Sequence, residues 1–221
     1  MTIKIAIDGP AGAGKSTIAK KVARLLGFTY IDTGAMYRAI TLKVLRENIP
    51  LSDKQKIIEI ARKSDVFLEG EKVFLDGEDV SEEIRKPAVS EKVSIVSQIP
   101  EVRKILVNKQ REIAKDKNVV MDGRDIGTVV FPEAQLKFFL TASLEERAKR
   151  RYEELRNKGT DVKYEKVLEE IKVRDDMDSK RKDSPLIIPE NAIVIDTTHL
   201  TEEEVVKKVF EEIKKIVRGE I

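Results

Sequence analysis

The sequence has no cysteine, no tryptophan and only one histidine, His199, in 221 residues. Without cysteine there is no disulfide framework, no thiolate zinc site and no cysteine nucleophile. A single histidine also excludes a histidine cluster. Any metal that this protein uses must therefore be held by oxygen ligands.

Long apolar runs and a strong charge imbalance are absent as well. No stretch approaches the roughly 18 consecutive apolar residues that a membrane-spanning helix needs, and the N-terminus enters a strand-like pattern without a signal peptide. The 42 basic and 40 acidic residues leave a net charge of +2, which provides no broad basic field for a polynucleotide. We therefore expect a cytoplasmic protein with no membrane or nucleic-acid partner.

Five short apolar runs of strand length alternate with segments of helical period. The runs lie at residues 3–7, 28–31, 118–122, 136–140 and 192–196. Continuous apolar strands that alternate with helices are typical of a parallel sheet covered on both faces. The sequence therefore predicts a single α/β domain with a five-stranded parallel sheet flanked by helices.

Two segments depart from this pattern. Residues 65–84 alternate apolar and polar side chains around EGEK and DGED, which predicts a small antiparallel sheet with tight turns, inserted into the core. Residues 150–185 contain two charged helical patterns around a Gly-Thr-Asp break. Because this second segment has few apolar residues, we expect a mobile arm or lid rather than part of a core.

A phosphate-binding loop follows the first apolar run. Residues 9–16, GPAGAGKS, match G-x-x-x-x-G-K-[ST] between a strand and a helical pattern. Glycines let backbone amides approach a phosphate closely, and the following helix directs its free amides at the same anion. We expect Lys15 to reach the β and γ phosphates of a nucleoside triphosphate and Ser16 to bind Mg²⁺. The candidate residues for binding this triphosphate are Gly9, Pro10, Ala11, Gly12, Ala13, Gly14, Lys15, Ser16 and Thr17.

Arginines indicate what receives the phosphoryl group. Open α/β folds bind ligands at the carboxyl ends of their strands, and Arg124 follows the buried-type strand VVMDG directly. Asp122, which ends that strand, is a candidate ligand of the Mg²⁺ shell. Arginine grips phosphate oxygens with two donors at once. Further candidates at strand ends or on the two departing segments are Arg38, Arg103, Arg174 and Arg181.

The chemistry of the acceptor favours a phosphate over an alcohol. An alcohol needs a base to remove its proton, whereas a phosphomonoester has a second pKa of about 6 and is already mostly dianionic at neutral pH. The sequence offers many arginines and no evident base. A kinase for another nucleoside monophosphate or a shikimate-like alcohol remains an alternative. So does a regulatory nucleotide switch, although NKQR at 108–111 lacks the aspartate of a guanine-specific Asn-Lys-x-Asp element.

Four segments in order resemble bacterial cytidylate kinases: IAIDGPAGAGKST, YIDTGAMYRA, MDGRDIGTVVFPEA and EIKVRDDMDSKR. The resemblance runs from about residue 3 to the last helix, and it is to the longer type, which carries an inserted lobe. It implies a P-loop fold that transfers the γ-phosphoryl group of ATP to CMP or dCMP, with Mg²⁺, to give ADP and CDP or dCDP.

The resemblance also implies an organisation into three parts. The core takes in about residues 1–33, 100–150 and 183–221. The monophosphate-binding region with its β insert covers about residues 34–99, and the lid about residues 151–182. We expect the protein to be a monomer.

The resemblance further assigns roles to individual residues. The expected contacts to the acceptor phosphate are Thr33, Arg38, Arg124 and Arg181. The residues that would contact the cytosine are Ser94, Arg103 and Asp125. A carboxylate accepts a hydrogen bond from the amine of cytosine and repels the carbonyl oxygen of uracil. Ser97 and Ser90 are alternatives to Ser94. Asp178, with Arg174, would face the sugar. The residues expected to be catalytic are Lys15, Arg124, Arg174 and Arg181.

Overall fold

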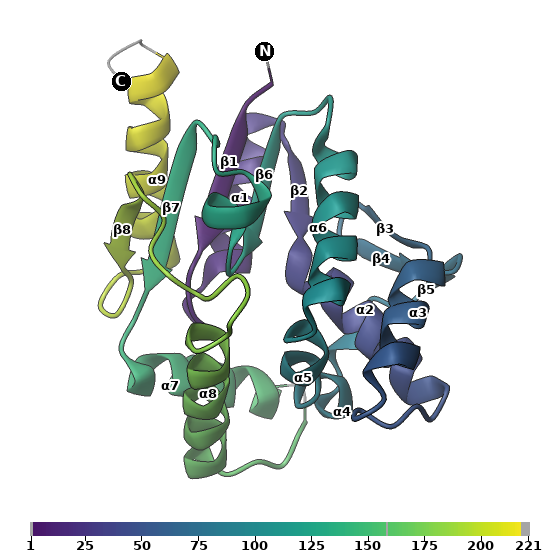
Figure 1. The fold of residues 1–221 in the computed structure, drawn as a ribbon. Helices are drawn as coiled ribbons and strands as arrows, with labels where there is room; N and C mark the ends of the chain where they lie inside the picture. Colours follow the sequence, from purple (N-terminus) through teal and green to yellow (C-terminus); the bar gives the residue numbers. More distant parts are fainter. Residues whose placement is uncertain (1, 158, 218–221) are drawn as a thin grey trace.

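A five-stranded parallel sheet lies at the centre of the computed structural model, which describes residues 2–157 and 159–217 (Figure 1). Its strands stand in the order β2-β6-β1-β7-β8. Each predicted apolar run is a strand whose bounds agree within one residue, which confirms the fold class. The strands are β1 (Lys4–Asp8), β2 (Thr29–Asp32), β6 (Val119–Gly123), β7 (Leu136–Thr141) and β8 (Ile193–Asp196).

Helices cover both faces of this sheet. In β1, Ile5 and Ile7 pack with α1 and α9 on one face, whereas Ala6 packs on the other face with β6, α6 and the π-helix η2. Such burial of successive residues explains why the strand is apolar throughout. The helices are α1 (Lys15–Leu26), α2 (Thr33–Arg46), α3 (Lys54–Lys63), α4 (Pro87–Ser90), α5 (Val93–Ser97), α6 (Pro100–Ala114), α7 (Leu144–Asn157), α8 (Tyr164–Ser179) and α9 (Glu202–Val217), with short turns η1 (Glu83–Arg85) and η2 (Ile126–Val130).

A second hydrophobic core lies beside the sheet, on the right of Figure 1. It contains side chains from all five helices from α2 through α6 and from the antiparallel sheet. The strands of this sheet are β3 (Val66–Glu69), β4 (Lys72–Leu75) and β5 (Glu78–Asp79). The predicted insert is thereby confirmed, with its two turns at EGEK and DGED. Because α2 starts directly after β2, this core is connected to the carboxyl edge of the parallel sheet.

The helices α7 and α8 lie beyond the carboxyl ends of the strands, at the lower end of Figure 1. The structure corrects the expectation from sequence in one respect. Although the segment has few apolar residues, the two helices have a small core of their own, centred on Ala148, Leu155, Val167 and Ile171. None of the helices in the described part of the chain is long and apolar enough to cross a membrane.

Candidate active site

The phosphate-binding loop follows β1 at the carboxyl edge of the sheet. A Cβ atom on Gly9 would lie 2.0 Å from the backbone oxygen of Leu140, so only glycine fits between the loop and β7. Gly14 is the N-cap of α1, and Lys15 begins this helix. The first amides of α1 therefore face the loop, where the N-terminus of a helix favours an anion.

Lys15 is buried within this loop, with 6% of its surface exposed. Its Nζ donates to the backbone oxygen of Pro10 at 2.7 Å. Burial, and then the nearby Arg124, lower the pKa of Lys15 well below its usual value, whereas Asp122 raises it. An anion bound beside this amine would stabilise its charged form.

Asp122 ends β6 and lies beside Ser16. The Ser16 hydroxyl donates to one carboxylate oxygen of Asp122 at 2.9 Å, and the Tyr30 hydroxyl donates to the other at 2.7 Å. Burial, and then the charge of Asp32, raise the pKa of Asp122 to about 6. Oxygen donors and an acidic pair of this kind suit a hard cation such as Mg²⁺.

Arginines from distant segments meet at the same edge. Arg124 Nε donates to Asp178 Oδ2 at 2.9 Å, and Arg181 Nη1 lies 3.8 Å from Asp178 Oδ1. Burial, and then the charge of Arg124, lower the pKa of Arg174 to about 9. Burial alone would raise the pKa of Asp178, but Arg124, Arg174 and Arg181 outweigh it, so the pKa is lowered. The structure thus places a positive cluster next to the phosphate-binding loop.

Several of these guanidinium groups have nitrogens that lack an acceptor. Arg38 Nε, Arg174 Nε and Arg181 Nη2 are buried, and none of them donates to any group within the described ranges. Buried donors are usually satisfied. Buried guanidinium nitrogens without an acceptor are available to an oxyanion.

Thr33 begins α2 at this edge, and Arg38 follows in the same helix. The Thr33 hydroxyl donates to the backbone oxygen of Asp122 at 2.7 Å. Arg38 lies 3.5 Å from Asp32, whose other carboxylate oxygen caps α2 by accepting from the amide of Ala35 at 2.8 Å. Because β2 and β6 pair Asp32 with Asp122, these groups lie together although they are far apart in sequence.

Arg103 and Asp125 form a buried ion pair deeper in the site. Their side chains are 2% and 6% exposed. Arg103 Nη1 also donates to the backbone oxygen of Ser97 at 3.2 Å, and the Ser97 hydroxyl donates to the backbone oxygen of Ser94 at 3.2 Å. Ser94 and Ser97 are both buried on α5, and Ser97 contacts the pair through its backbone oxygen, whereas Ser90 ends the separate helix α4.

Tyr37, whose role the sequence leaves open, packs in the second core. The guanidinium carbon of Arg103 lies 5.3 Å from the centre of its ring, and the Tyr37 hydroxyl has no hydrogen-bond partner in the described part of the chain. The ring therefore supports the Arg103–Asp125 pair from one side.

Sequence reasoning missed several residues that the structure places at this edge. Asp8 is fully buried and accepts from the amides of Ile126 and Gly127 at 2.8 and 2.7 Å. Burial raises the pKa of Asp8 to about 7. Its position directly before the phosphate-binding loop is the sequence feature that could have identified it as a site residue. The other missed residues are Tyr30, Asp32, Arg147 and Asp175, whose contacts join segments far apart in the chain.

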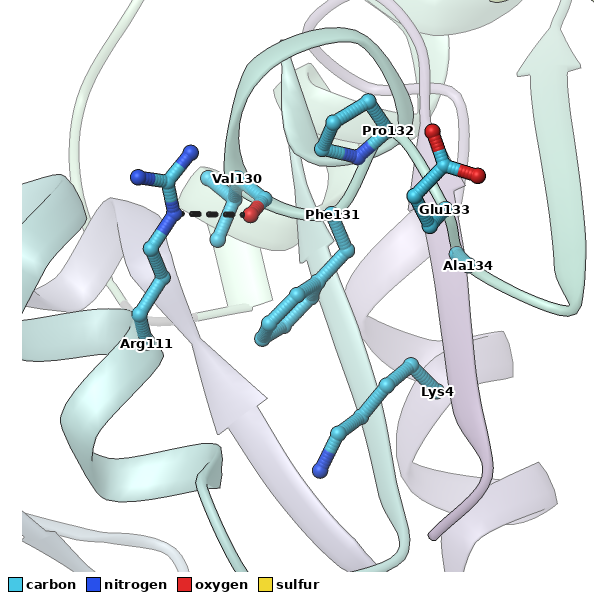
Figure 2. A pocket seen from close by; sticks show the side chains of 7 residues that line it. All are labelled: Lys4, Arg111, Val130, Phe131, Pro132, Glu133 and Ala134. Atoms are coloured by element: carbon cyan, nitrogen blue, oxygen red, sulfur yellow. Dashed lines mark hydrogen bonds between the residues drawn. The ribbon is translucent and has the colours of Figure 1, made fainter. Parts of the chain in front are cut away.

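A pocket of about 310 Å³ lies apart from these residues (Figure 2). It includes Lys4, the first residue of β1, so it lies at the amino edge of the sheet, opposite the loop. Lys4 Nζ donates to the backbone oxygens of Ala114 and Lys117, and Arg111 Nε donates to that of Val130 at 3.0 Å. These cations therefore hold the end of α6 and the turn after it. The pocket is lined by Lys4, Arg111, Val130, Phe131, Pro132, Glu133 and Ala134.

Solved structures of two kinases share this fold. A gluconokinase from Sinorhizobium meliloti superimposes with a TM-score of 0.51 at 14% identity, over 98% of this chain and 94% of its own. A shikimate kinase from Bacteroides thetaiotaomicron superimposes with a TM-score of 0.50 at 13% identity, over 96% and 98%. At such identity the likeness shows the fold alone.

Sequence relatives are far closer. A cytidylate kinase from Caldanaerobacter subterraneus is 78% identical over 100% of this chain and 99% of its own length. Another, from Bacillus subtilis, is 51% identical over 96% of this chain and 97% of its own. The family model for cytidylate kinase matches residues 5–215. A match over nearly the whole length, joined to a phosphate loop beside a cluster of buried arginines, places this chain in the cytidylate kinase family.

Proposed function

We propose that this chain transfers the γ-phosphoryl group of ATP to CMP or dCMP, giving ADP and CDP or dCDP, and that its cluster of buried arginines makes the transfer possible. The observation that carries this proposal is the set of guanidinium nitrogens without an acceptor beside Lys15. Two anions repel each other as they approach in line, and preorganised cations offset this repulsion in a water-poor site.

On the donor side, the loop residues Gly9 to Thr17 hold the phosphates of ATP. Lys15, whose ammonium group donates to the Pro10 oxygen, would contact the β and γ phosphates from this position. Ser16 and Asp122 would hold Mg²⁺, because their oxygens already lie together and a cation would relieve the repulsion between Asp122 and Asp32. When bound, the ion neutralises charge on the phosphoryl oxygens.

On the acceptor side, the candidate ligands of the monophosphate are Thr33, Arg38, Arg124 and Arg181. Arg124 and Arg181 are both held by Asp178, so their donors are oriented before the nucleotide arrives. No general base is required, since the acceptor oxygen is already ionised. The charges of Arg174 and Arg124 both act on Lys15, so Arg174 would help to stabilise the negative charge that moves during transfer.

The cytosine would bind at the Arg103–Asp125 pair. The Asp125 carboxylate accepts from the exocyclic amine, and the ion pair with Arg103 holds that carboxylate in place. A uracil oxygen at the same position would meet a carboxylate and leave polar groups unpaired, which is how such a site rejects an analogue. Ser94 would add a hydroxyl contact to the base, and Asp178 would contact the sugar.

Closure of α7 and α8 over the nucleotides would exclude water, which otherwise hydrolyses ATP. We also propose that the protein works as a monomer in the cytoplasm, where ATP and CMP are present. Light scattering of the purified protein at assay concentration measures the oligomeric state.

A coupled assay of ADP formation tests the function, with ATP and Mg²⁺ against CMP, dCMP, UMP, AMP and shikimate. We expect turnover with CMP and dCMP far above the others. Higher turnover with UMP or AMP would refute the cytosine site, and the absence of ADP with every acceptor would favour a nucleotide switch. Replacing Arg124 and Arg181 together with glutamine should abolish CMP binding. Unchanged velocity and CMP affinity would refute the role of the arginines.

A further inference from the structure

The geometry points to a clamp on the phosphate loop, formed by Arg147 of α7 and Asp175 of α8, that sets the position of the catalytic Lys15. We call these two residues, together with the backbone of Ala11 that they hold, the Ala11 clamp. The inference rests on the proposed role of the loop in binding ATP and adds two positioning residues to it.

Both polar backbone groups of Ala11 are bound by the two side chains. The amide of Ala11 donates to Asp175 Oδ1 at 3.3 Å, and its carbonyl oxygen accepts from Arg147 Nη1 at 3.1 Å. Arg147 Nη1 also donates to Asp175 Oδ2, which closes the arrangement. The side chains are 9% and 20% exposed, so these charge-assisted bonds are largely shielded from water.

Arg147 is fixed by more than this ion pair. Its Nε donates to the backbone oxygen of Ala142, directly after β7, at 2.9 Å. The loop approaches α7 so closely that a Cβ atom on Gly12 would lie 3.0 Å from the Cβ and backbone oxygen of Arg147. Arg147 is thereby anchored to the sheet, while Asp175 reaches the loop from the second helix of the pair.

The clamp connects directly to Lys15 through one peptide unit. The carbonyl of Pro10 and the amide of Ala11 are opposite ends of the same planar group. At one end the Pro10 oxygen accepts from Lys15 Nζ at 2.7 Å, and at the other the Ala11 amide donates to Asp175. Any rotation of this peptide moves both bonds together, and bonds in series polarise one another.

This connection gives the clamp a function in catalysis. With α8 in place, the peptide is held with its oxygen toward Lys15, so the ammonium group stays beside the Pro10 oxygen within the phosphate loop. ATP then meets a lysine that needs little reorganisation to reach its phosphates. Loss of the clamp leaves the peptide free to rotate and the lysine free to move, which weakens the donor side of the site and leaves the acceptor side intact.

Asp175→Asn and Arg147→Met each remove the ion pair and test this inference. We measure the binding of ATP with Mg²⁺ by isothermal titration calorimetry, without CMP, and the KM values for ATP and CMP in turnover. Loss of a charge-assisted bond predicts a rise of about tenfold in the Kd and KM for ATP. The KM for CMP at saturating ATP should stay within about twofold of its value in the unaltered protein, since neither residue contacts the acceptor residues.

Asp176→Asn is the matched control, because Asp176 is the next residue on α8 and pairs with Lys180 in solvent, with side chains 63% and 76% exposed. It should leave both KM values unchanged. The double variant Arg147→Met/Asp175→Asn should be no worse than either single variant, because both act through the same peptide. Arg147→Lys keeps the charge and should retain more of the ATP affinity than Arg147→Met. If Arg147→Met does not fold, the ATP affinity of Arg147→Lys tests the clamp in its place.

Equal effects on ATP and CMP, additive losses in the double variant, or an equal loss in Asp176→Asn would each overturn the clamp. The calorimetric measurement needs no phosphoryl transfer. An unaltered protein that binds ATP but does not phosphorylate CMP would therefore refute the proposed function while leaving the clamp to be judged on ATP affinity alone.

Discussion

Removing the charge of Asp125 tests whether its buried pair with Arg103 reads the nucleotide base. In Asp125→Asn the Arg103 guanidinium stays buried, with 2% of its side chain exposed, but loses its counter-charge. Breaking a buried ion pair from one side costs about 3–5 kcal/mol of folding free energy. We expect urea unfolding to show a loss of this size.

The same variant should lose selectivity between CMP and UMP. The amide that replaces the carboxylate no longer offers a charged acceptor to the exocyclic amine of cytosine, and it no longer repels the carbonyl of uracil. A hydrogen bond to a charged group contributes about 1.5–3 kcal/mol, which corresponds to roughly 10- to 150-fold in the ratio of kcat/KM values for the two acceptors. The coupled ADP assay measures this ratio, and the KM for ATP should hardly change.

A double variant separates base recognition from stability. Arg103→Met/Asp125→Asn removes both charges of this pair, and replacing a buried pair by uncharged groups is often nearly neutral for folding. It should recover most of the lost stability but none of the selectivity. If the double variant still prefers CMP over UMP by the original factor, Asp125 does not read the base and our assignment is wrong.

Three further predictions concern the donor side and the core. Lys15→Ala should lower kcat on the order of 10²- to 10³-fold by removing one preorganised cation; an unchanged kcat in the ADP assay would reject its role. Ser16→Ala should raise the Mg²⁺ concentration needed for half-maximal turnover, and a Mg²⁺ titration identical to that of the unaltered protein would remove Ser16 from the metal site. The pKa of Asp8 is about 7 in the folded protein, against 3.8 when unfolded. Between these two pH values the folded state therefore binds more protons than the unfolded state. The contribution of Asp8 to the free energy of unfolding falls as pH rises through this range. Asp8→Asn should remove this dependence, by up to about 1.4 kcal/mol per pH unit, and parallel stability curves for the two proteins in urea titrations at several pH values would contradict it.

Local patterns were sufficient to predict the strands and the phosphate loop. A strand buried on both faces must be apolar throughout, as β1 is with Ile5, Ala6 and Ile7, and a loop that cradles phosphate must be rich in glycine. The α7–α8 segment was predicted less well. Its small core is centred on Ala148, Leu155, Val167 and Ile171, with partly buried apolar side chains packed around them, and apolar residues scattered over two charged helices give little periodic signal until the helices pack together.

The sequence by itself determined the phosphate-binding loop motif, the positions of the five strands of the parallel sheet, and the supply of arginines for a charged acceptor. Only the tertiary structure decided which of these groups meet. Asp178 holds Arg124 and Arg181, and Asp175 reaches Ala11 across 164 positions of the chain. The physical reason is that parallel strands bring their carboxyl ends to one edge of the sheet. Residues that meet there come from distant parts of the chain, and their spacing in the sequence does not show that they are close in space.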